Sequence, residues 1–171
     1  RGKRWSATSA YLKPVMSRSN LTIRTNTAVE NLCLDMSDGR LRAKGVSACI
    51  NGKEKVQFTA RREILLSAGA VGSPQILQLS GIGSEKLLQD RGVKVNLDLP
   101  GVGENLQDHL QVRSVYKVKN TVTLNQRANS LAGKALMGLE YFLLKTGPLT
   151  MPPSQLGAFA KSDPSQSSAN I

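Results

Sequence analysis

Two pairs of turn residues constrain the fold of this sequence more than any other feature. Asp38-Gly39 and Asn51-Gly52 are dipeptides that readily adopt the positive φ angles of a tight hairpin turn. Strand-favouring segments flank them at about residues 27–36, 42–50 and 54–61. The sequence therefore predicts a three-stranded antiparallel meander.

The segment after the meander is typical of a parallel α/β sheet. Residues 64–69 are almost continuously apolar, as in a strand that is covered on both faces. Ser73 is a favoured N-cap and Pro74 a favoured first helical residue, which predicts a short helix over residues 75–80. A buried strand followed at once by a helix indicates the α/β class.

Further helices and strands are predicted on both sides of this region. Ser84 is a suitable N-cap for a helix over residues 85–91, and alternating apolar residues predict a strand over residues 93–99. Four more elements are expected. Two are helices: one covers residues 6–16, with Ser6 as its N-cap, and Pro14 ends or kinks it; the other covers residues 130–145, begins at Ser130 and stops before Gly147-Pro148. The other two are strands, at residues 21–24 and 112–118. The apolar residues of the last helix are interpreted as core.

The charge of the chain raises one alternative function. The formal net charge is +11, from 23 Lys and Arg against 12 Asp and Glu, and such a surplus suits a basic nucleic-acid-binding module. The basic residues are scattered, however, and aromatic residues make up only 4%, too few for base-stacking surfaces. We therefore expect no nucleic-acid partner. No run of 18 apolar residues occurs, so no transmembrane segment is predicted.

The two cysteines indicate a reducing compartment. Cys33 and Cys49 form no metal motif, and the hairpin register places Cys33 opposite about residue 44, too far from Cys49 for a disulfide. We expect two reduced, buried thiols and a cytoplasmic location. Attachment to a membrane through the parent protein is left open.

Residues 69–83 resemble the second signature of the glucose-methanol-choline (GMC) oxidoreductase family at every specified position. Similar family blocks occur in the right order at residues 4–6, 11–12, 20–21, 61–69 and 99–109. The resemblance is strong over residues 4–113 and weaker beyond. Within the family the chain is most similar to choline dehydrogenases and bacterial FAD-dependent alcohol dehydrogenases.

The resemblance implies a two-part organisation. Residues 1–111 would be the later part of a Rossmann-like FAD-binding domain with the meander inserted, and residues 112–171 the beginning of an α+β substrate-binding domain. The chain begins with Arg1 and not with Met, so we expect an internal piece of a longer protein. The family's N-terminal dinucleotide fingerprint and its C-terminal catalytic histidine block have no match here. We therefore expect no catalytic residue in this piece, which alone should be inactive and bind FAD weakly or not at all.

Three segments are implied as contacts of FAD. The backbone at Ala28 and Val29 would meet the adenine end, the bend at residues 68–70 would let the main chain approach the cofactor, and the loop after Pro100 would run close to the flavin. The candidate residues are Ala28, Val29, Ala68, Gly69, Ala70, Ser73, Asn105, Asp108 and His109. Simpler roles remain open: Val29 as strand core, the bend as packing only, Ser73 as a helix cap, and His109 as a residue that positions its loop. For Ser73 and His109 the simpler role is preferred.

The activity implied by the resemblance is oxidation of an alcohol. In the intact enzyme a hydride would pass from the CH–OH carbon of the substrate to flavin N5, and the electrons would then pass to a quinone, another acceptor or oxygen. A flavin-containing lyase on the same scaffold, without net redox chemistry, is the alternative. The sequence does not identify the alcohol.

Overall fold

The computed structural model describes residues 2–108, 110–111, 113, 115–151 and 157–169. The chain forms two compact units. One is Thr22–Asp108, and the other combines Arg1–Leu21 with His109–Ile171. All the candidate residues that the structure describes belong to the first unit.

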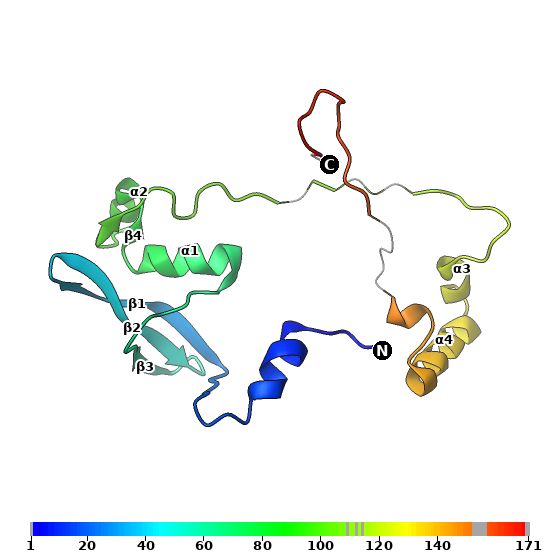
Figure 1. The fold of residues 1–171 in the computed structure, drawn as a ribbon, viewed down its shortest axis with the longest axis horizontal. Coiled ribbons are helices and arrows are strands. Elements are labelled where there is room, and N and C mark those ends of the chain that lie inside the picture. Colours follow the sequence, from blue (N-terminus) through cyan, green and yellow to red (C-terminus); the bar gives the residue numbers. More distant parts are fainter. Residues whose placement is uncertain (1, 109, 112, 114, 152–156, 170–171) are drawn as a thin grey trace. The chain divides into compact units, whose positions relative to one another are not determined.

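The first unit contains the predicted meander. Strands β1 (Thr27–Ser37), β2 (Arg40–Ile50) and β3 (Glu54–Thr59) form an antiparallel sheet in the order β1-β2-β3 (Figure 1). Both residues of each turn dipeptide have positive φ, at 53° and 70° for Asp38 and Gly39. Two residues separate the paired Ser37 and Arg40, as in a two-residue hairpin turn, and three separate Ile50 and Glu54, so the prediction of the meander is confirmed.

The register of β1 against β2 is irregular at two places. Register shifts fall between Val29 and Asn31 and between Cys33 and Leu34. Cys33 pairs with Gly45, whereas Cys49 lies opposite Ala28, and both thiols are free as predicted. The thiols are half-buried and not buried as expected.

The predicted strand at residues 64–69 is wrong. Residues 61–68 form neither helix nor strand, and Leu65 is 80% exposed. A strand covered on both faces needs hydrogen-bonding neighbours at its edges. No segment within the described residues pairs with this run.

Helix α1 (Gly69–Leu79) begins six residues before the predicted start at residue 75. Pro74 lies inside the helix, in its second turn, and Ser73 is a helical residue and not the N-cap. The Ser-Pro pair therefore gave a wrong start. The residues of the first turn have small side chains and form a helix upstream of Pro74. The proline destabilises this helix, because it removes one backbone hydrogen bond and its ring crowds the preceding turn.

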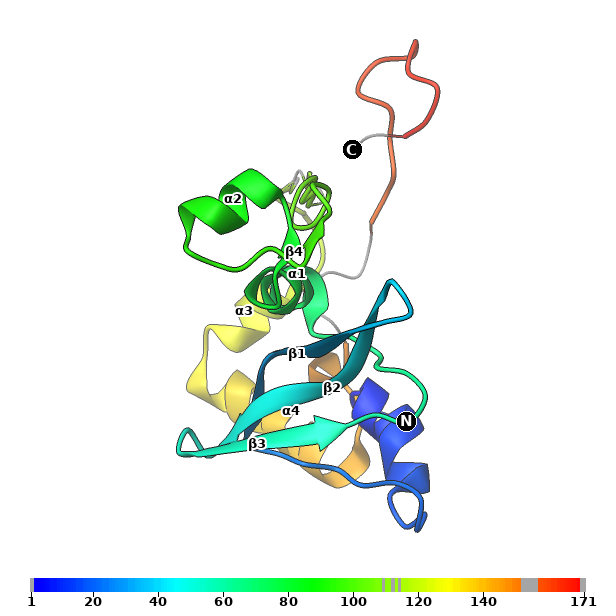
Figure 2. The ribbon, with the colours of Figure 1, turned by 90° about the vertical axis from the view of Figure 1, so that its left-hand side faces the viewer.

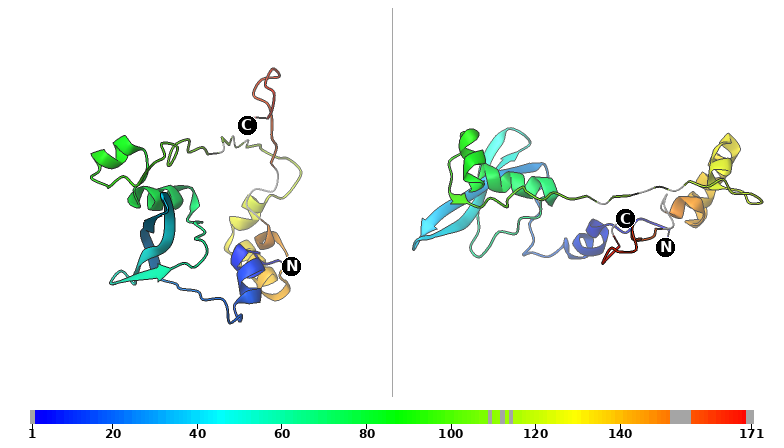
Figure 3. Two further views of the ribbon diagram at one scale, coloured as in Figure 1. Left: turned by 60° about the vertical axis from the view of Figure 1, so that its left-hand side comes forward. Right: turned by 90° about the horizontal axis from the view of Figure 1, so that it is seen from above.

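A small parallel unit follows α1. Strand β4 (Ile82–Gly83) pairs in parallel with β5 (Leu97–Asp98), and α2 (Glu85–Asp90) forms the crossover between them. The predicted second helix is confirmed, whereas the strand expected over residues 93–99 is reduced to two residues. Helix α1 lies between the meander and α2 (Figure 2), and a view from another side shows the same order (Figure 3, left). The fold is thus mixed α/β, as predicted.

The second unit is helical. A π-helical turn η1 (Thr8–Leu12) and a 3₁₀ turn η2 (Lys13–Val15) lie near its start, and the Ser6 hydroxyl accepts a hydrogen bond from Ser9 N at 3.3 Å. The change of helix type at Pro14 agrees with the predicted kink. Residues 21–24, of which 22–24 belong to the first unit, form no strand, and neither do residues 113 and 115–118. Val112 and Ser114, which belong to the same predicted strand, lie outside the described residues.

Helices α3 (Leu124–Ala128) and α4 (Leu131–Leu144) follow, and a 3₁₀ turn η3 (Pro148–Thr150) comes after them. The Ser130 hydroxyl accepts a hydrogen bond from Gly133 N at 2.9 Å, so the predicted cap is confirmed. The interpretation of α4 as core is wrong in this unit, because only Met137 is buried and most of its apolar side chains are exposed. None of the helices in the described part of the chain is both long and apolar enough to span a membrane.

Candidate functional site

The signature segment opens with a backbone bend. Gly69 has a φ of +86°, a conformation that side-chain-bearing residues rarely adopt. A Cβ atom built on Gly69 would meet nothing within 4 Å, so the space beside the bend is open. The Ser73 hydroxyl accepts a hydrogen bond from Ala68 N at 3.0 Å and holds the bend from inside the helix.

The bend exposes its backbone to solvent, apart from the Ala68 N–H, which donates to the Ser73 hydroxyl. Ala68, Gly69 and Ala70 are exposed, and no side chain caps the start of α1. The first N–H groups of a helix have no partner within the helix and lie at the positive end of its dipole. The arrangement can therefore accept a polar or anionic group at backbone distance.

A loop at residues 100–108 is held against α1. The Gln78 side-chain amide donates a hydrogen bond to the Val102 carbonyl oxygen at 3.0 Å. Asn105, further along this loop, is exposed and has a φ of +58°. Asp108 is exposed, and His109 lies outside the described residues. The structure thus brings the loop to the signature helix through Gln78.

The strand candidates Ala28 and Val29 lie at the beginning of β1. They pair with Cys49 and Ala48, directly before the first register shift of the strand. Ala28 is exposed and Val29 is 38% exposed. The view of Val29 as a core residue is therefore not supported.

A buried serine joins β1 to α1. Ser80, which is 6% exposed, directly follows α1. Its hydroxyl donates to the Ile76 carbonyl oxygen at 2.6 Å and accepts from Leu32 N of β1 at 2.7 Å. The Asn96 amide donates to the Ser80 carbonyl oxygen at 2.9 Å. Sequence reasoning missed Ser80, because a serine before a glycine at a helix end is interpreted as part of the stop signal.

The residue after this serine has no room for a side chain. Gly81 has a φ of +77°, and a Cβ atom there would overlap the Lys94 carbonyl oxygen. The Gly81 carbonyl oxygen accepts from Asn96 N at 2.8 Å and Leu97 N at 3.1 Å. The last part of the signature is therefore structural: it joins α1, the meander and the β4-β5 pair.

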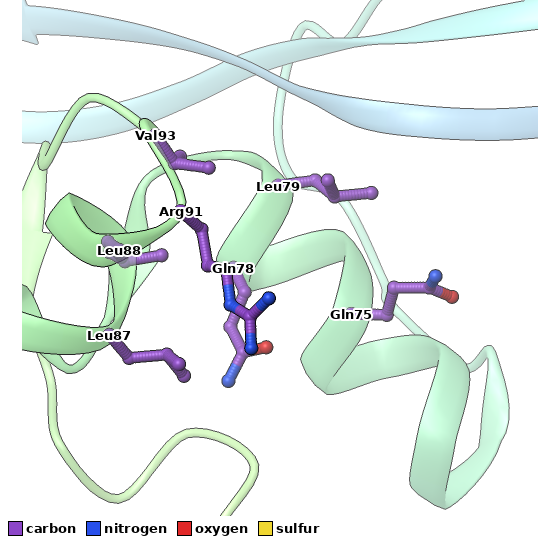
Figure 4. Close-up of a pocket in the computed structure, with 7 residues that line it drawn as sticks. All are labelled: Gln75, Gln78, Leu79, Leu87, Leu88, Arg91 and Val93. Carbon is purple, nitrogen blue, oxygen red and sulfur yellow. The ribbon is translucent and has the colours of Figure 1, made fainter.

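A shallow hollow lies between α1 and α2. Figure 4 shows Gln75, Gln78 and Leu79 from α1 on one side and Leu87, Leu88 and Arg91 on the other, with Val93 nearby. No predicted cofactor-binding residue lines it. The candidates lie instead on three exposed segments: the start of β1, the bend at residues 68–70 and the loop at residues 100–108. Gln78 connects α1 to the loop, and Ser80 connects the end of α1 to β1.

Formal charges are sparse in these contacts. Within the described residues the structure has one ion pair, between Lys55 Nζ and Glu30 Oε2 at 3.7 Å. No group of three or more His, Cys, Asp or Glu residues in the described part of the chain could hold a metal ion. The chemistry available at the bend and the loop is hydrogen bonding by backbone and amide groups.

Comparison with known proteins assigns the family. The model of the GMC oxidoreductase family matches residues 1–111. An oxygen-dependent choline dehydrogenase of Photobacterium profundum is 44% identical over 147 residues, which cover 86% of this chain and 25% of that protein. The chain spans about a quarter of the length of the curated relatives that it matches.

Solved structures agree with this assignment. An FAD-dependent oxidoreductase from Chaetomium thermophilum is 34% identical with a TM-score of 0.67, and the match covers 80% of this chain and 23% of that one. A formate oxidase of Aspergillus oryzae is 26% identical with a TM-score of 0.62, over 80% of this chain and 23% of that one. The bend, the loop and the buried serine described above all lie within the matched residues 1–111. Because the family model matches more than half of the chain, the chain belongs to the GMC oxidoreductase family.

Proposed function

We propose that this chain forms part of an FAD-dependent oxidoreductase that acts on the CH–OH group of an alcohol. The observation that carries the proposal is the bend at Gly69, which combines a positive φ, open space and an uncapped helix start. The names of the relatives support it, since they include an oxygen-dependent choline dehydrogenase and an FAD-dependent oxidoreductase.

The residues at the bend fit a flavin nucleotide. A cofactor that approaches the main chain closely requires small residues, and Ala68, Gly69 and Ala70 supply no bulk. The uncapped N–H groups of α1 suit the negative oxygens of a phosphate-containing cofactor. We propose that these residues and the backbone of Ala28 and Val29 hold FAD, and that Ser73 supports the bend through Ala68.

The loop at residues 100–108 would complete this side of the cofactor site. Gln78 fixes its position, so Asn105 and Asp108 are proposed to donate or accept hydrogen bonds near the flavin. We propose the same region for His109, as a residue that positions the loop. FAD supplies the hydride acceptor, while the residues of this chain bind and orient it. We assign no catalytic residue to the chain.

The proposed organisation has a domain boundary near residue 111. Residues 1–111 would belong to the FAD-binding domain, and residues 112–171 to the substrate-binding domain. The end of the family match at residue 111 supports this boundary. The two free thiols are consistent with the proposed cytoplasmic location.

The test is reduction of bound flavin by alcohols, in the full-length protein that contains this chain. Choline is the first substrate to test and oxygen the first acceptor, and an aliphatic and an aromatic alcohol extend the range. Under anaerobic conditions a substrate alcohol should bleach the visible absorbance of the flavin, and oxygen or a quinone should restore it.

Two other outcomes are distinguishable. Bound flavin that no alcohol bleaches would reject the alcohol oxidoreductase and favour the lyase. DNA binding at about micromolar affinity at physiological salt, with a steep salt dependence, would favour the basic binding module.

A further inference from the structure

We propose that Ser80 is a positioning residue that fixes β1 against α1, and so sets the relation between two backbone segments of the cofactor site. This inference rests on the proposed function, because the two segments are Ala28–Val29 and the bend at Gly69. Ser80 itself contacts neither segment in the structure. Its proposed effect is transmitted through Leu32 and through α1.

The hydroxyl of Ser80 meets β1 at an irregular part of the strand. β1 is an outer strand that pairs only with β2 among the described strands, so part of its N–H groups face away from the sheet. Leu32 N is such a group, and it donates to Ser80 Oγ at 2.7 Å. Leu32 lies between the two register shifts of β1 and three residues after Val29. This hydrogen bond between Leu32 N and Ser80 Oγ, here called the tie, therefore fixes the start of β1 relative to α1.

A hydroxyl group suits this position because it donates and accepts at once. Ser80 Oγ donates to the Ile76 carbonyl oxygen at 2.6 Å, which orients its remaining lone pairs toward Leu32. With Ser80 6% exposed, water has little access to replace these bonds. Loss of the hydroxyl would leave the Leu32 N–H without its acceptor.

The end of α1 has little freedom to compensate. The Ser80 carbonyl oxygen accepts from the Asn96 amide at 2.9 Å, and Gly81 leaves no space beside the Lys94 carbonyl oxygen. The backbone at Ser80 and Gly81 is thus anchored to residues 94–97, at the start of β5. A change at Ser80 should therefore alter the position of β1 and not that of the helix end.

The experiment compares single variants of the full-length, FAD-loaded protein. Ser80→Ala should accelerate FAD release by about five- to thirtyfold, the range expected when buried hydrogen bonds are lost, and should change the visible circular dichroism of the flavin. In the apoprotein the Leu32 amide should exchange with solvent faster by a similar factor. Ser80→Cys retains the size but bonds weakly, so it should give an intermediate release rate and serves if the alanine variant does not fold.

Two controls separate positioning from general stability. Ser84→Ala makes the same change four residues later, where the side chain makes no capping hydrogen bond, and should leave FAD release unchanged. Leu88→Ala removes a side chain that is 2% exposed and destabilises the unit without touching the Ser80 contacts. For the same decrease in unfolding temperature, Ser80→Ala must accelerate FAD release more than Leu88→Ala does.

Two results would overturn the inference. One is that FAD release follows unfolding temperature identically in Ser80→Ala and Leu88→Ala. The other is an unchanged exchange rate of the Leu32 amide. A wild-type protein that binds no FAD would instead refute the proposed function, and the Leu32 measurement would still report on the tie.

Discussion

Gly69 and Gly81 lie at the two ends of helix α1, and both adopt positive φ, but their surroundings differ. Gly69 has open space where a side chain would stand, so only its backbone conformation requires glycine. At Gly81 a side chain would also overlap the Lys94 carbonyl oxygen. One glycine therefore keeps a surface bare, and the other allows two backbone segments to meet.

Alanine substitutions should separate these two requirements. Gly69→Ala should lower the free energy of unfolding by about 1–2 kcal/mol, the cost of the left-handed conformation. Gly81→Ala should cost more, because overlap adds to the same strain. Gly138→Ala, in the middle of α4 with open space around it, should instead stabilise by about 0.5–1 kcal/mol. Urea unfolding measures all three, and equal losses for Gly69→Ala and Gly81→Ala would contradict the overlap.

Two glutamines of α1 allow a test of the loop contact. Gln78→Ala should release the loop at residues 100–108, because it removes the bond to the Val102 carbonyl oxygen. Limited proteolysis should then cut this loop faster than in the wild type. Gln75→Ala is the matched control, since Gln75 is exposed and its side chain makes no hydrogen bond with any of the described residues. Equal cleavage in both variants would show that Gln78 does not hold the loop.

At the scale of elements, the start of helix α2 is capped from a distance. The sequence predicts Ser84 as its N-cap, and Ser84 does occupy that position, but its side chain makes no capping hydrogen bond. Asp98 Oδ1, on strand β5, accepts instead from Glu85 N at 2.9 Å. The parallel pairing of β4 with β5 brings this carboxylate to the helix start.

The two cap candidates should respond differently to substitution. Asp98→Ala should lower the free energy of unfolding by about 1 kcal/mol, the usual worth of a cap. Ser84→Ala should change it by less than about 0.5 kcal/mol, as expected for a side chain without a special contact. Thermal unfolding of both variants checks the pair, and the reverse order would show that Ser84 is the cap in solution.

At the scale of the whole molecule, exposed large apolar side chains greatly outnumber buried apolar side chains among the described residues. The described core consists of Ala48, Ile76, Ile82, Leu88 and Met137. Large apolar residues such as Leu65 and Phe142 are 80% and 73% exposed. The choline dehydrogenase relative from Photobacterium profundum is about three and a half times as long as this chain, since 147 residues make up 25% of it, and exposed apolar surface of this kind is typical of a contact with other parts of a protein.

This exposure predicts how the 171-residue chain behaves by itself. Expressed alone, it should bind the dye ANS strongly and carry no bound flavin, because its candidate cofactor residues lie on open surface. Dye fluorescence and visible absorbance of the purified chain measure the two properties. A yellow chain that retains FAD through gel filtration would show that these residues suffice for binding.

Features of the fold could be predicted from the sequence where the residues that determine them are close together along the chain. The hairpin turn at Asp38-Gly39 and the Ser130 cap were predicted correctly, because each is determined by a few neighbouring residues. The strand at residues 64–69 failed because an apolar run becomes a strand only where other strands pair with it.

The candidate site shows the same limit. The bend at Gly69 could be predicted, because small residues in a signature mark it locally. The tie between Ser80 and Leu32 could not be predicted, since 48 residues separate its partners and a serine hydroxyl accepts from many donors. Helix α3 was also missed, although Thr123 and Gln126 form a capping box that is visible in the sequence.

Among the described strands β1 pairs on one side only, which has a consequence for self-association. An outer strand with free peptide groups is a template on which a strand from another molecule can grow. Ser80 occupies one of these groups, at Leu32, and keeps α1 beside the strand. Loosening this contact would uncover the template, so the same hydroxyl should also protect the protein from aggregation.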